Sequence, residues 1–291
     1  MIGVDWGTTR LRAFLLRDDG SREVLDRRES TQGVRSVELG RFPDVLRALV
    51  APWLAEGERR ILMTGTVGSR HGWTETRPVP CPATLDDLVA ALGHVAFPDA
   101  CVRVVPGVTT TDAAGVPDLM RGEETQIVGT ALTDGTICLP GSHSKWARVE
   151  HGTITDFTTY LTGEAFAALG AHTLLAPLVG NHAPSAGPAF DAGLARSSEP
   201  GGLLHHLFGV RTLGLAGRWT GGDAASYLSG LLIGHEIHAV PHASADTVVV
   251  IGTPALAALY VRAIGGRAIL GDSDAAVHGL ALIGARVTWT T

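Results

Sequence analysis

Two stretches of the chain, about half its length apart, share one pattern of apolar and polar positions. In the first, an alternating segment at residues 11–16 follows a short amino-terminal strand, and a third extended segment lies at residues 23–29. In the second, apolar residues 137–139 lead into a loop and then into extended segments at residues 146–149 and 154–160. Alternation of this kind is typical of half-buried strands. Each stretch is therefore predicted to form a meander of three strands.

Apolar residues spaced three and four apart predict helices around these meanders. Helices are expected over residues 43–55, 123–132, 223–239, 254–264 and 273–286, and a further one is expected to begin at Thr84. Buried strands are expected at residues 60–64, 102–105 and 247–251. Residues 177–188 are rich in Gly, Pro, Asn and Ser, so they predict a loop or lid. Strands that alternate with helices indicate an α/β protein.

The composition narrows the class of protein. The chain has 291 residues, of which 45% are hydrophobic, and its formal net charge is −6. That charge, without a lysine-rich patch, argues against nucleic-acid binding. The three cysteines are spaced unlike zinc ligands, so neither a disulfide framework nor a metal site is indicated. The start has no basic leader and the longest apolar run is interrupted, which predicts a cytoplasmic protein without a membrane segment.

The loop after the first strand has the composition of a phosphate-binding turn. Asp5 is expected to end the strand, and Gly7 to let a ligand approach the backbone closely. The amides of Gly7, Thr8 and Thr9, with the two threonine hydroxyls, would then face a bound anion. An ordinary β-hairpin has similar turns, so that alternative stays open at this stage.

A loop of similar design separates the first two strands of the second meander. Its candidate phosphate-binding residues are Gly141, Ser142, His143, Ser144 and Lys145. Lys145 is the only lysine among the 23 lysine and arginine residues. A compact ammonium in a glycine turn suits a phosphate, although a single lysine must lie somewhere in the chain.

The two similar halves resemble the actin, Hsp70 and sugar-kinase superfamily. Besides the loops, Gly122-Glu123-Glu124-Thr125-Gln126 followed by Gly129 is similar to the G-D-(Q/N)-x-A-x-x-G signature of glycerol- and xylulokinase-type enzymes. The resemblance implies an α/β fold of two ribonuclease-H-like domains, with the active site in the interdomain cleft. We place the domain boundary near Asp118, so that the domains span residues 1–118 and 119–291.

More narrowly, the chain resembles the 2-dehydro-3-deoxygalactonokinase family over essentially its whole length. The specific motifs lie at residues 121–126 and 140–146, and the segments 65–73 and 162–164 also match. The resemblance implies ATP-dependent phosphorylation of 2-dehydro-3-deoxy-D-galactonate to its 6-phosphate, a step of D-galactonate breakdown. The alternatives are a kinase for another sugar or sugar acid, such as 2-dehydro-3-deoxy-D-gluconate, and a phosphatase or nucleotidase of the same fold.

The resemblance and the needs of phosphoryl transfer together assign roles to several residues. Glu123 would be the catalytic base, with Glu124 as its rival, because adjacent helical residues point roughly 100° apart. Asp5 would hold Mg²⁺, and the two loops would bind the phosphates of ATP. Gly252 and Thr253, at a predicted helix start, would bind the adenosine end.

A keto acid needs a partner for its carboxylate, and three arginines in or near the motifs are candidates: Arg12, Arg70 and Arg121. Ser69 and Trp73, in the glycine-rich loop, would line the sugar side. The expected partners are therefore ATP and a small sugar acid. A homodimer is compatible with the sequence, which does not decide the oligomeric state.

Two groups of histidines are expected to play no part in catalysis. His235-Glu236-Ile237-His238 falls one residue short of the H-E-x-x-H zinc signature, so it predicts a polar stripe on a helix. The pair His205-His206 is predicted to be ordinary surface or helix polarity.

Overall fold

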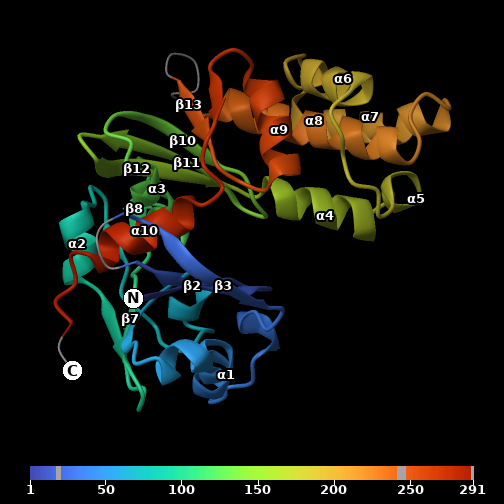
Figure 1. The fold of residues 1–291 in the computed structure, drawn as a ribbon. Coiled ribbons are helices and arrows are strands. Elements are labelled where there is room, and N and C mark those ends of the chain that lie inside the picture. Colours follow the sequence, from blue (N-terminus) through green and yellow to red (C-terminus); the bar gives the residue numbers. More distant parts are fainter. Residues whose placement is uncertain (18–20, 241–246, 290–291) are drawn as a thin grey trace. The chain divides into compact units, whose positions relative to one another are not determined.

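The computed structural model describes residues 1–17, 21–240 and 247–289, and they group into two compact units (Figure 1). Unit 1 comprises Met1–Asp134, Arg148–Phe157 and Asp274–Thr291, and unit 2 comprises Gly135–Ala147 and Thr158–Ser273. Asp118 lies within unit 1. The division of the chain into domains at that residue stays a prediction.

The first sheet contains the predicted amino-terminal meander. Its strands follow the order β3-β2-β1-β4-β7-β6. Their bounds are β1 Ile2–Trp6, β2 Leu11–Leu16, β3 Val24–Ser30, β4 Arg60–Thr64, β6 Gly93–Val95 and β7 Cys101–Val104. Strands β1, β2 and β3 pair antiparallel, β4 lies parallel to β1, and β7 lies parallel to β4. The predicted strands of this half are confirmed.

Two helices cover opposite faces of this sheet (Figure 1). The helices of unit 1 are α1 (Phe42–Ala55), α2 (Leu85–Ala90), α3 (Glu123–Thr130) and α10 (Ala275–Gly284). Leu46 and Val50 of α1 share a buried cluster with Ile2 of β1. Leu280 of α10 shares another with Leu16 of β2. The sheet is buried on both sides because successive strand residues point to opposite faces.

Helices α3 and α10 cross at backbone contact. A Cβ atom on Gly129 would lie 1.8 Å from the carbonyl oxygen of Ala275, and one on Gly279 would lie 1.8 Å from that of Thr125. No side chain larger than hydrogen fits at either position. The last glycine of the kinase-like motif is therefore needed for the packing of α3 on α10.

A small sheet leads the chain into α3. Its strands are β5 (Val79–Pro80), β8 (Val108–Thr111) and β9 (Pro117–Met120), in the order β5-β8-β9. The sequence did not predict these strands, because segments of two to four residues are too short to show a period. Since β9 ends at Met120, it places the next residue, Arg121, directly before α3.

The second sheet repeats the plan of the first. Its order is β12-β11-β10-β13-β14, with β13 parallel to β10 and β14 parallel to β13. The strands are β10 Gly135–Leu139, β11 Ser144–Glu150, β12 Thr153–Tyr160, β13 Val248–Val250 and β14 Ala268–Leu270. When the strands of each sheet are numbered along the chain and the edge strand β6 is left out, both sheets have the order 3-2-1-4-5. This repeat is the ribonuclease-H-like arrangement that the sequence resemblance implied.

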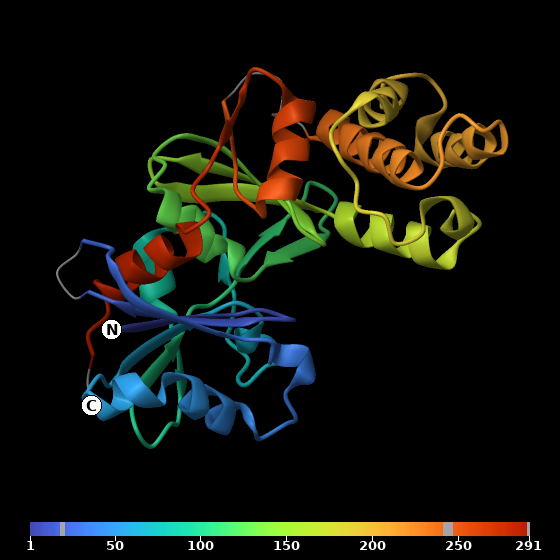
Figure 2. The same ribbon diagram turned by 45° about the vertical axis from the view of Figure 1, so that its right-hand side comes forward.

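Unit 2 adds a group of helices beside its sheet (Figure 2). They are α4 (Thr162–His172), α5 (Ala176–Val179), α6 (Pro188–Ser197), α7 (Gly202–Leu215), α8 (Gly222–Ala239) and α9 (Pro254–Ile264). The predictions of α8 and α9 are confirmed, whereas α4, α6 and α7 were not predicted. The predicted loop at residues 177–188 begins inside α5. None of the helices in the described part of the chain has the length and apolar character needed to cross a bilayer.

Candidate active site

The loop between β1 and β2 is a tight turn with free backbone donors. The amide of Gly7 donates to the carbonyl of Arg10 over 2.9 Å, and the Gly7 carbonyl accepts from Val34 over 3.0 Å. Thr8 and Thr9 are exposed, and their amides donate to no acceptor among the described residues. The turn thus presents two N–H groups that an anion could accept.

Asp5 and Arg12 form an ion pair at the base of this turn. They are direct partners in the antiparallel register of β1 and β2, and an Arg12 nitrogen contacts an Asp5 carboxylate oxygen. Asp5 is 19% exposed. The predicted metal ligand and one candidate carboxylate clamp are therefore already bonded to each other.

The loop between β10 and β11 has the same character. Ser142 and His143 are exposed, and the amides of Gly141, Ser142 and His143 donate to no acceptor among the described residues. The start of α4 supports the loop from behind. A Cβ atom on Gly163 would lie 2.3 Å from the carbonyl oxygen of Gly141, and the amide of Glu164 donates to the Ser142 carbonyl over 2.8 Å. The Glu164 carboxylate also pairs with the His143 ring.

Two residues that the sequence assigned to the phosphates have buried side chains. Ser144 is 0% exposed, and its Oγ donates to Glu236 Oε2 over 2.8 Å. Lys145 is 4% exposed, and its Nζ donates to the carbonyl oxygen of His143 over 3.0 Å. Both side chains hold the loop in shape. A direct contact of either with ATP stays a prediction.

Glu236 lies at the centre of a buried hydrogen-bond network, so the predicted polar stripe on α8 is wrong at this residue. It is 3% exposed and also accepts from Trp146 Nε1 over 2.7 Å and from the Tyr260 hydroxyl over 2.8 Å. Burial raises the pKa of Glu236. The carboxylate therefore joins α8, β11 and α9 beneath the β10–β11 loop. The sequence offered no signal for this role beyond a glutamate among apolar residues.

The histidine pair on α7 also differs from expectation. His206 is 0% exposed, and its Nδ1 lies 2.9 Å from Nε2 of His235 on α8. His205 is exposed, as predicted. The described residues contain no group of three or more His, Cys, Asp and Glu side chains that could hold a metal ion.

A pocket of about 260 Å³ lies next to the β10–β11 loop within unit 2. Its lining includes Gly141, Ser142, Phe166, Leu232, Ile233 and Leu256. A Cβ atom on Gly252 would lie 3.3 Å from the carbonyl oxygen of Pro140, so the predicted adenosine turn adjoins this loop. Thr253 is exposed and precedes the first turn of α9. An apolar pocket beside free amides suits a ligand with a flat ring and an anionic tail.

The two adjacent glutamates at the start of α3 have different environments. Glu123 is half-buried, and its carboxylate accepts the amide of Arg121 over 3.0 Å. Glu124 is 0% exposed, and it accepts the amide of Gly122 over 2.6 Å and the hydroxyl of Thr125 over 2.9 Å. Burial and the neighbouring Glu123 raise the pKa of Glu124 to about 7. Of the two, Glu123 is the one that solvent or a substrate reaches.

The ends of two parallel strands meet the start of α3. Gly65, which follows β4, has a φ of 95°, and a Cβ atom there would lie 2.7 Å from the Trp6 carbonyl oxygen. A Cβ atom on Gly122 would lie 3.2 Å from the Cα of Gly65. Asp5 of β1 is in register with Thr64 of β4. Unit 1 thus brings Asp5 and Glu123 to the carboxyl ends of its parallel strands, where α/β sheets bind ligands.

The remaining sugar-side candidates differ in what they contact. Trp73 packs with Trp6 and Phe42 at ring distances of 6.4 and 6.3 Å, so much of its ring belongs to the core. Ser69 is half-buried, and Arg70 is exposed. Arg70 has no hydrogen-bond or ion-pair partner within the described residues.

Arg121 supports the glycine-rich loop from below. Its guanidinium donates to the hydroxyl of Thr76, and its Nη2 donates to the Thr76 carbonyl over 3.1 Å. Burial lowers the pKa of Arg121, although it stays a cation at neutral pH. Its donors are therefore used inside the protein.

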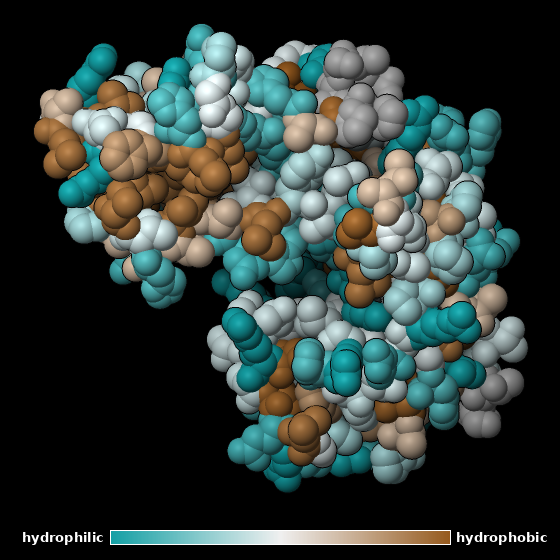
Figure 3. Space-filling model, turned by 180° about the vertical axis from the view of Figure 1, so that it is seen from behind, coloured by the Kyte–Doolittle hydropathy of each residue, from teal (hydrophilic) through white to brown (hydrophobic). Residues whose placement is uncertain are grey.

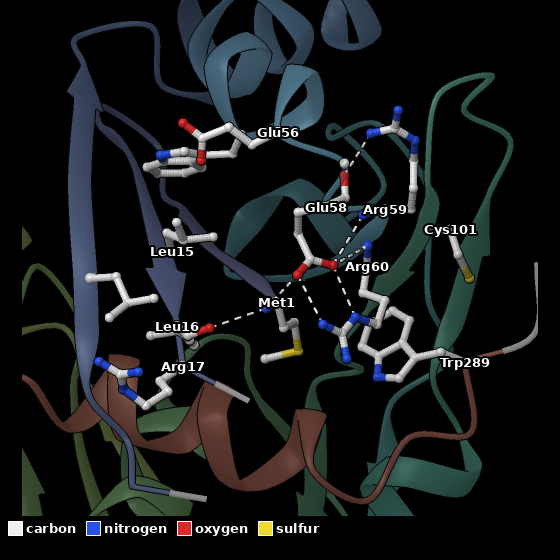
Figure 4. A pocket seen from close by; sticks show the side chains of 13 residues that line it. Met1, Leu15, Leu16, Arg17, Glu56, Glu58, Arg59, Arg60, Cys101 and Trp289 are labelled. Atoms are coloured by element: carbon white, nitrogen blue, oxygen red, sulfur yellow. Dashed lines mark hydrogen bonds and ion pairs between the residues drawn. The ribbon is translucent and has the colours of Figure 1, made fainter. Parts of the chain in front are cut away.

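A larger pocket of unit 1 lies away from these residues (Figure 4). It has a volume of about 600 Å³ and lies at the amino ends of β1, β4 and β7, with Met1, Glu58, Arg60 and Trp289 in its wall. None of the predicted site residues lines it. Within its wall, Glu58 binds both the amino group of Met1 and the guanidinium of Arg60.

Comparison with known proteins decides the family. Residues 5–283 match the family described as 2-keto-3-deoxy-galactonokinase. The chain belongs to this family. It is 33% identical over 303 residues to a protein of Rhizobium meliloti (strain 1021) named probable 2-dehydro-3-deoxygalactonokinase, with 98% of this chain and 96% of the relative covered. It is 34% identical over 268 residues to the 2-dehydro-3-deoxygalactonokinase of Escherichia coli (strain K12), with 90% and 88% covered.

Solved structures agree with the sequence match. A crystal structure from Sinorhizobium meliloti, described as a 2-dehydro-3-deoxygalactonokinase protein, is similar with a TM-score of 0.88 at 32% identity, over 98% of both chains. The activator of 2-hydroxyisocaproyl-CoA dehydratase from Clostridium difficile, solved with bound ADPNP, has a TM-score of 0.51 at 13% identity, over 98% of this chain and 94% of the other. The predicted family, its kinase class and the actin-like ATPase or sugar-kinase fold are confirmed.

Proposed function

We propose that this chain is an ATP-dependent kinase that phosphorylates 2-dehydro-3-deoxy-D-galactonate at its terminal hydroxyl, giving the 6-phosphate. The observation that carries the proposal is the family match over residues 5–283. The names of the two curated relatives support the same substrate. A cytoplasmic location fits an enzyme that consumes ATP in sugar-acid breakdown.

Glu123 is the proposed general base. Its carboxylate is half-exposed at the first turn of α3, whereas that of Glu124 is enclosed and bonded to Gly122 and Thr125. A carboxylate that meets the substrate hydroxyl accepts its proton as the oxygen attacks the γ-phosphorus. The bond to the Arg121 amide fixes the direction of the Glu123 side chain.

The phosphates of ATP are proposed to bind backbone amides of the β1–β2 loop and of the β10–β11 loop. The free amides of Thr8 and Thr9, and those of Gly141, Ser142 and His143, would bind phosphate oxygens, as preorganised N–H groups do in other phosphate sites. The adenosine end would enter the 260 Å³ pocket that Leu256 and Phe166 line, beside Gly252 and Thr253.

Asp5 is the proposed ligand of Mg²⁺. A half-buried carboxylate at a strand end is a hard oxygen donor of the kind that this ion prefers, directly or through water. When bound, Mg²⁺ would neutralise charge on the phosphate oxygens. Arg12 now pairs with Asp5, and its guanidinium would be available to a phosphate once the carboxylate holds the cation.

Arg70 is the proposed partner of the substrate carboxylate. It is exposed in the loop that follows β4, while Arg12 and Arg121 already donate to Asp5 and Thr76. Ser69 lies beside it and would contact a sugar hydroxyl.

A coupled assay with ATP, Mg²⁺ and the galacto- and gluco-configured keto-deoxy acids tests the proposal. We expect turnover of the galacto acid, and a Glu123→Gln variant should lose about 10²- to 10⁴-fold in kcat with little change in KM for ATP. Glu38→Gln, at an exposed position, is the matched control. Arg70→Ala should raise KM for the keto acid only, and Arg77→Ala, an exposed arginine nearby, should not.

The same assay separates the alternatives. ATP hydrolysis that is independent of any acceptor would indicate a phosphatase or nucleotidase instead. Turnover of the gluco acid alone would keep the kinase and change its substrate. An unchanged kcat for Glu123→Gln would overturn the assignment of the base.

A further inference from the structure

The outer face of α7 carries an apolar stripe that nothing in the described chain covers. Leu204 is 85% exposed, Phe208 58% and Leu215 69%, and Arg211 completes the stripe. The opposite face of the helix, with His206 and Val210, is buried. Figure 3 shows apolar side chains gathered over the helical part of unit 2, at the upper left of that view.

The spacing of this stripe is that of a helix-pairing seam. Its residues, 204, 208, 211 and 215, follow one another by four, three and four positions. Alternation of three and four is the pattern that packs one α-helix along another with side chains interlocked. A helix that only covered its own unit would need no such seam on its solvent side.

The seam is also symmetric about its own midpoint. If two copies of α7 lie antiparallel with a two-fold axis beside residues 209 and 210, Leu204 of one copy faces Leu215 of the other. Phe208 then faces Arg211, and each contact occurs twice, as a two-fold interface requires. The two leucines at the ends of the seam then contact each other across the axis. In the middle, the Arg211 guanidinium contacts the Phe208 ring, which is a favourable cation–π pair.

We propose that two copies of this chain form a dimer through antiparallel pairing of their α7 helices. The charges at the two ends of α7 favour this antiparallel pairing. Glu199 lies just before α7 and Arg218 just after it, and both are exposed. Antiparallel pairing brings the acidic end of one helix near the basic end of the other, whereas parallel pairing would bring like charges together.

The exposed apolar area of the seam is about half of what one partner buries in a standard interface. With exposures of 85, 58 and 69%, the three apolar side chains offer roughly 400 Å² if each spans about 200 Å² in full. A standard interface buries about 800 Å² on each partner, so the seam would form its apolar centre. The exposed His205 and Thr212 would form its rim.

Light scattering after size-exclusion chromatography tests the proposal. The wild type should elute with twice the mass of the 30.3 kDa chain over a dilution series. Leu204→Glu should give the monomer mass, because it places a carboxylate against Leu215 of the other copy. Leu39→Glu is the matched control, since Leu39 is 90% exposed outside α7, and it should stay dimeric. Circular dichroism and kinase activity confirm that each variant is folded.

A double variant tests the antiparallel register. Leu204→Glu combined with Leu215→Lys restores opposite charges across the proposed axis, so the dimer mass should return. The two positions are eleven residues apart on one helix and do not contact each other within it. A monomeric wild type, a dimer that Leu204→Glu leaves intact, or a double variant that stays monomeric would each overturn the proposal.

Discussion

Glu236 offers the sharpest test of how the β10–β11 loop is held. Its carboxylate accepts from Ser144, Trp146 and Tyr260 in a site where it is 3% exposed. Ser144 is the first residue of β11, so this network fixes the point at which the loop ends. We compare two substitutions, Glu236→Gln and Glu236→Leu, that keep the volume and change the number of acceptors.

The loss in the free energy of unfolding for each substitution depends on which donors of Ser144, Trp146 and Tyr260 lose their acceptor. With leucine, two hydroxyls and an indole N–H lose their acceptor, and each buried unsatisfied donor costs about 1 to 3 kcal/mol. The Tyr260 hydroxyl can still donate to Ser144 Oγ, at 3.2 Å, and the burial of a charge is relieved. We therefore expect a loss of about 2 to 4 kcal/mol for Glu236→Leu. In Glu236→Gln, the amide oxygen can still accept from Trp146, and the amide nitrogen can donate to the hydroxyls of Ser144 and Tyr260. We therefore expect a loss of stability of about 1 kcal/mol.

Urea unfolding followed by tryptophan fluorescence measures these losses, and Glu38→Leu at an exposed position is the control. Because burial raises the pKa of Glu236, its ionisation opposes folding increasingly as pH rises above the unfolded value of about 4.5. The penalty of Glu236→Gln should therefore shrink with rising pH. KM for ATP should rise more in the leucine variant than in the glutamine variant. Equal stability of the two variants would refute this account of the network.

Two further predictions concern unit 1. Gly129→Ala places a Cβ atom 1.8 Å from the Ala275 carbonyl oxygen and should cost about 3 kcal/mol or more, whereas Gly266→Ala, with open space around it, should be neutral in the same urea experiment. Glu58 is 16% exposed, and burial alone would raise its pKa, but hydrogen bonds from Arg60 and from the amino group of Met1 (Figure 4) lower the pKa to about 2. The ionised Glu58 should therefore stabilise the folded state by about 3 kcal/mol. This stabilisation should be complete above the pKa of Glu58 in the unfolded chain, about 4.5, and should disappear as pH falls toward 2. Glu58→Gln should therefore destabilise strongly at pH 7 and by less than half as much near pH 3. Equal effects of Glu58→Gln and Glu56→Gln at pH 7 would contradict this.

The fold was predictable where local pattern and tertiary environment agree. Both meanders have two-residue alternation and glycine turns, and their strands were found. Helix α7 was missed because apolar residues surround it, with Phe208 exposed and Val210 buried, so no single face stands out. The strands β5, β8 and β9 were missed because each is too short to show a period.

The site was predictable where the chemistry is local. Free amides follow from glycine turns, and Glu123 follows from its motif. Glu236 was misjudged because its partners, Ser144 and Trp146, are distant in the sequence and become neighbours only through folding. Helix geometry alone did not rank the adjacent Glu123 and Glu124, since it separates their directions without saying which one points inward, and only the motif favoured Glu123.

The three candidate arginines show why a list of cations does not identify a carboxylate site. All three lie in or near motifs, so their positions in the sequence do not indicate which one binds the substrate carboxylate. Arg121 would have to give up its bonds to Thr76, and a hydrogen bond that involves a charged group contributes about 1.5 to 3 kcal/mol. Arg12 would have to leave the Asp5 carboxylate uncompensated unless a cation replaced it. Arg70 loses only hydration when it binds a carboxylate, so the same contact yields more net free energy there than at either alternative.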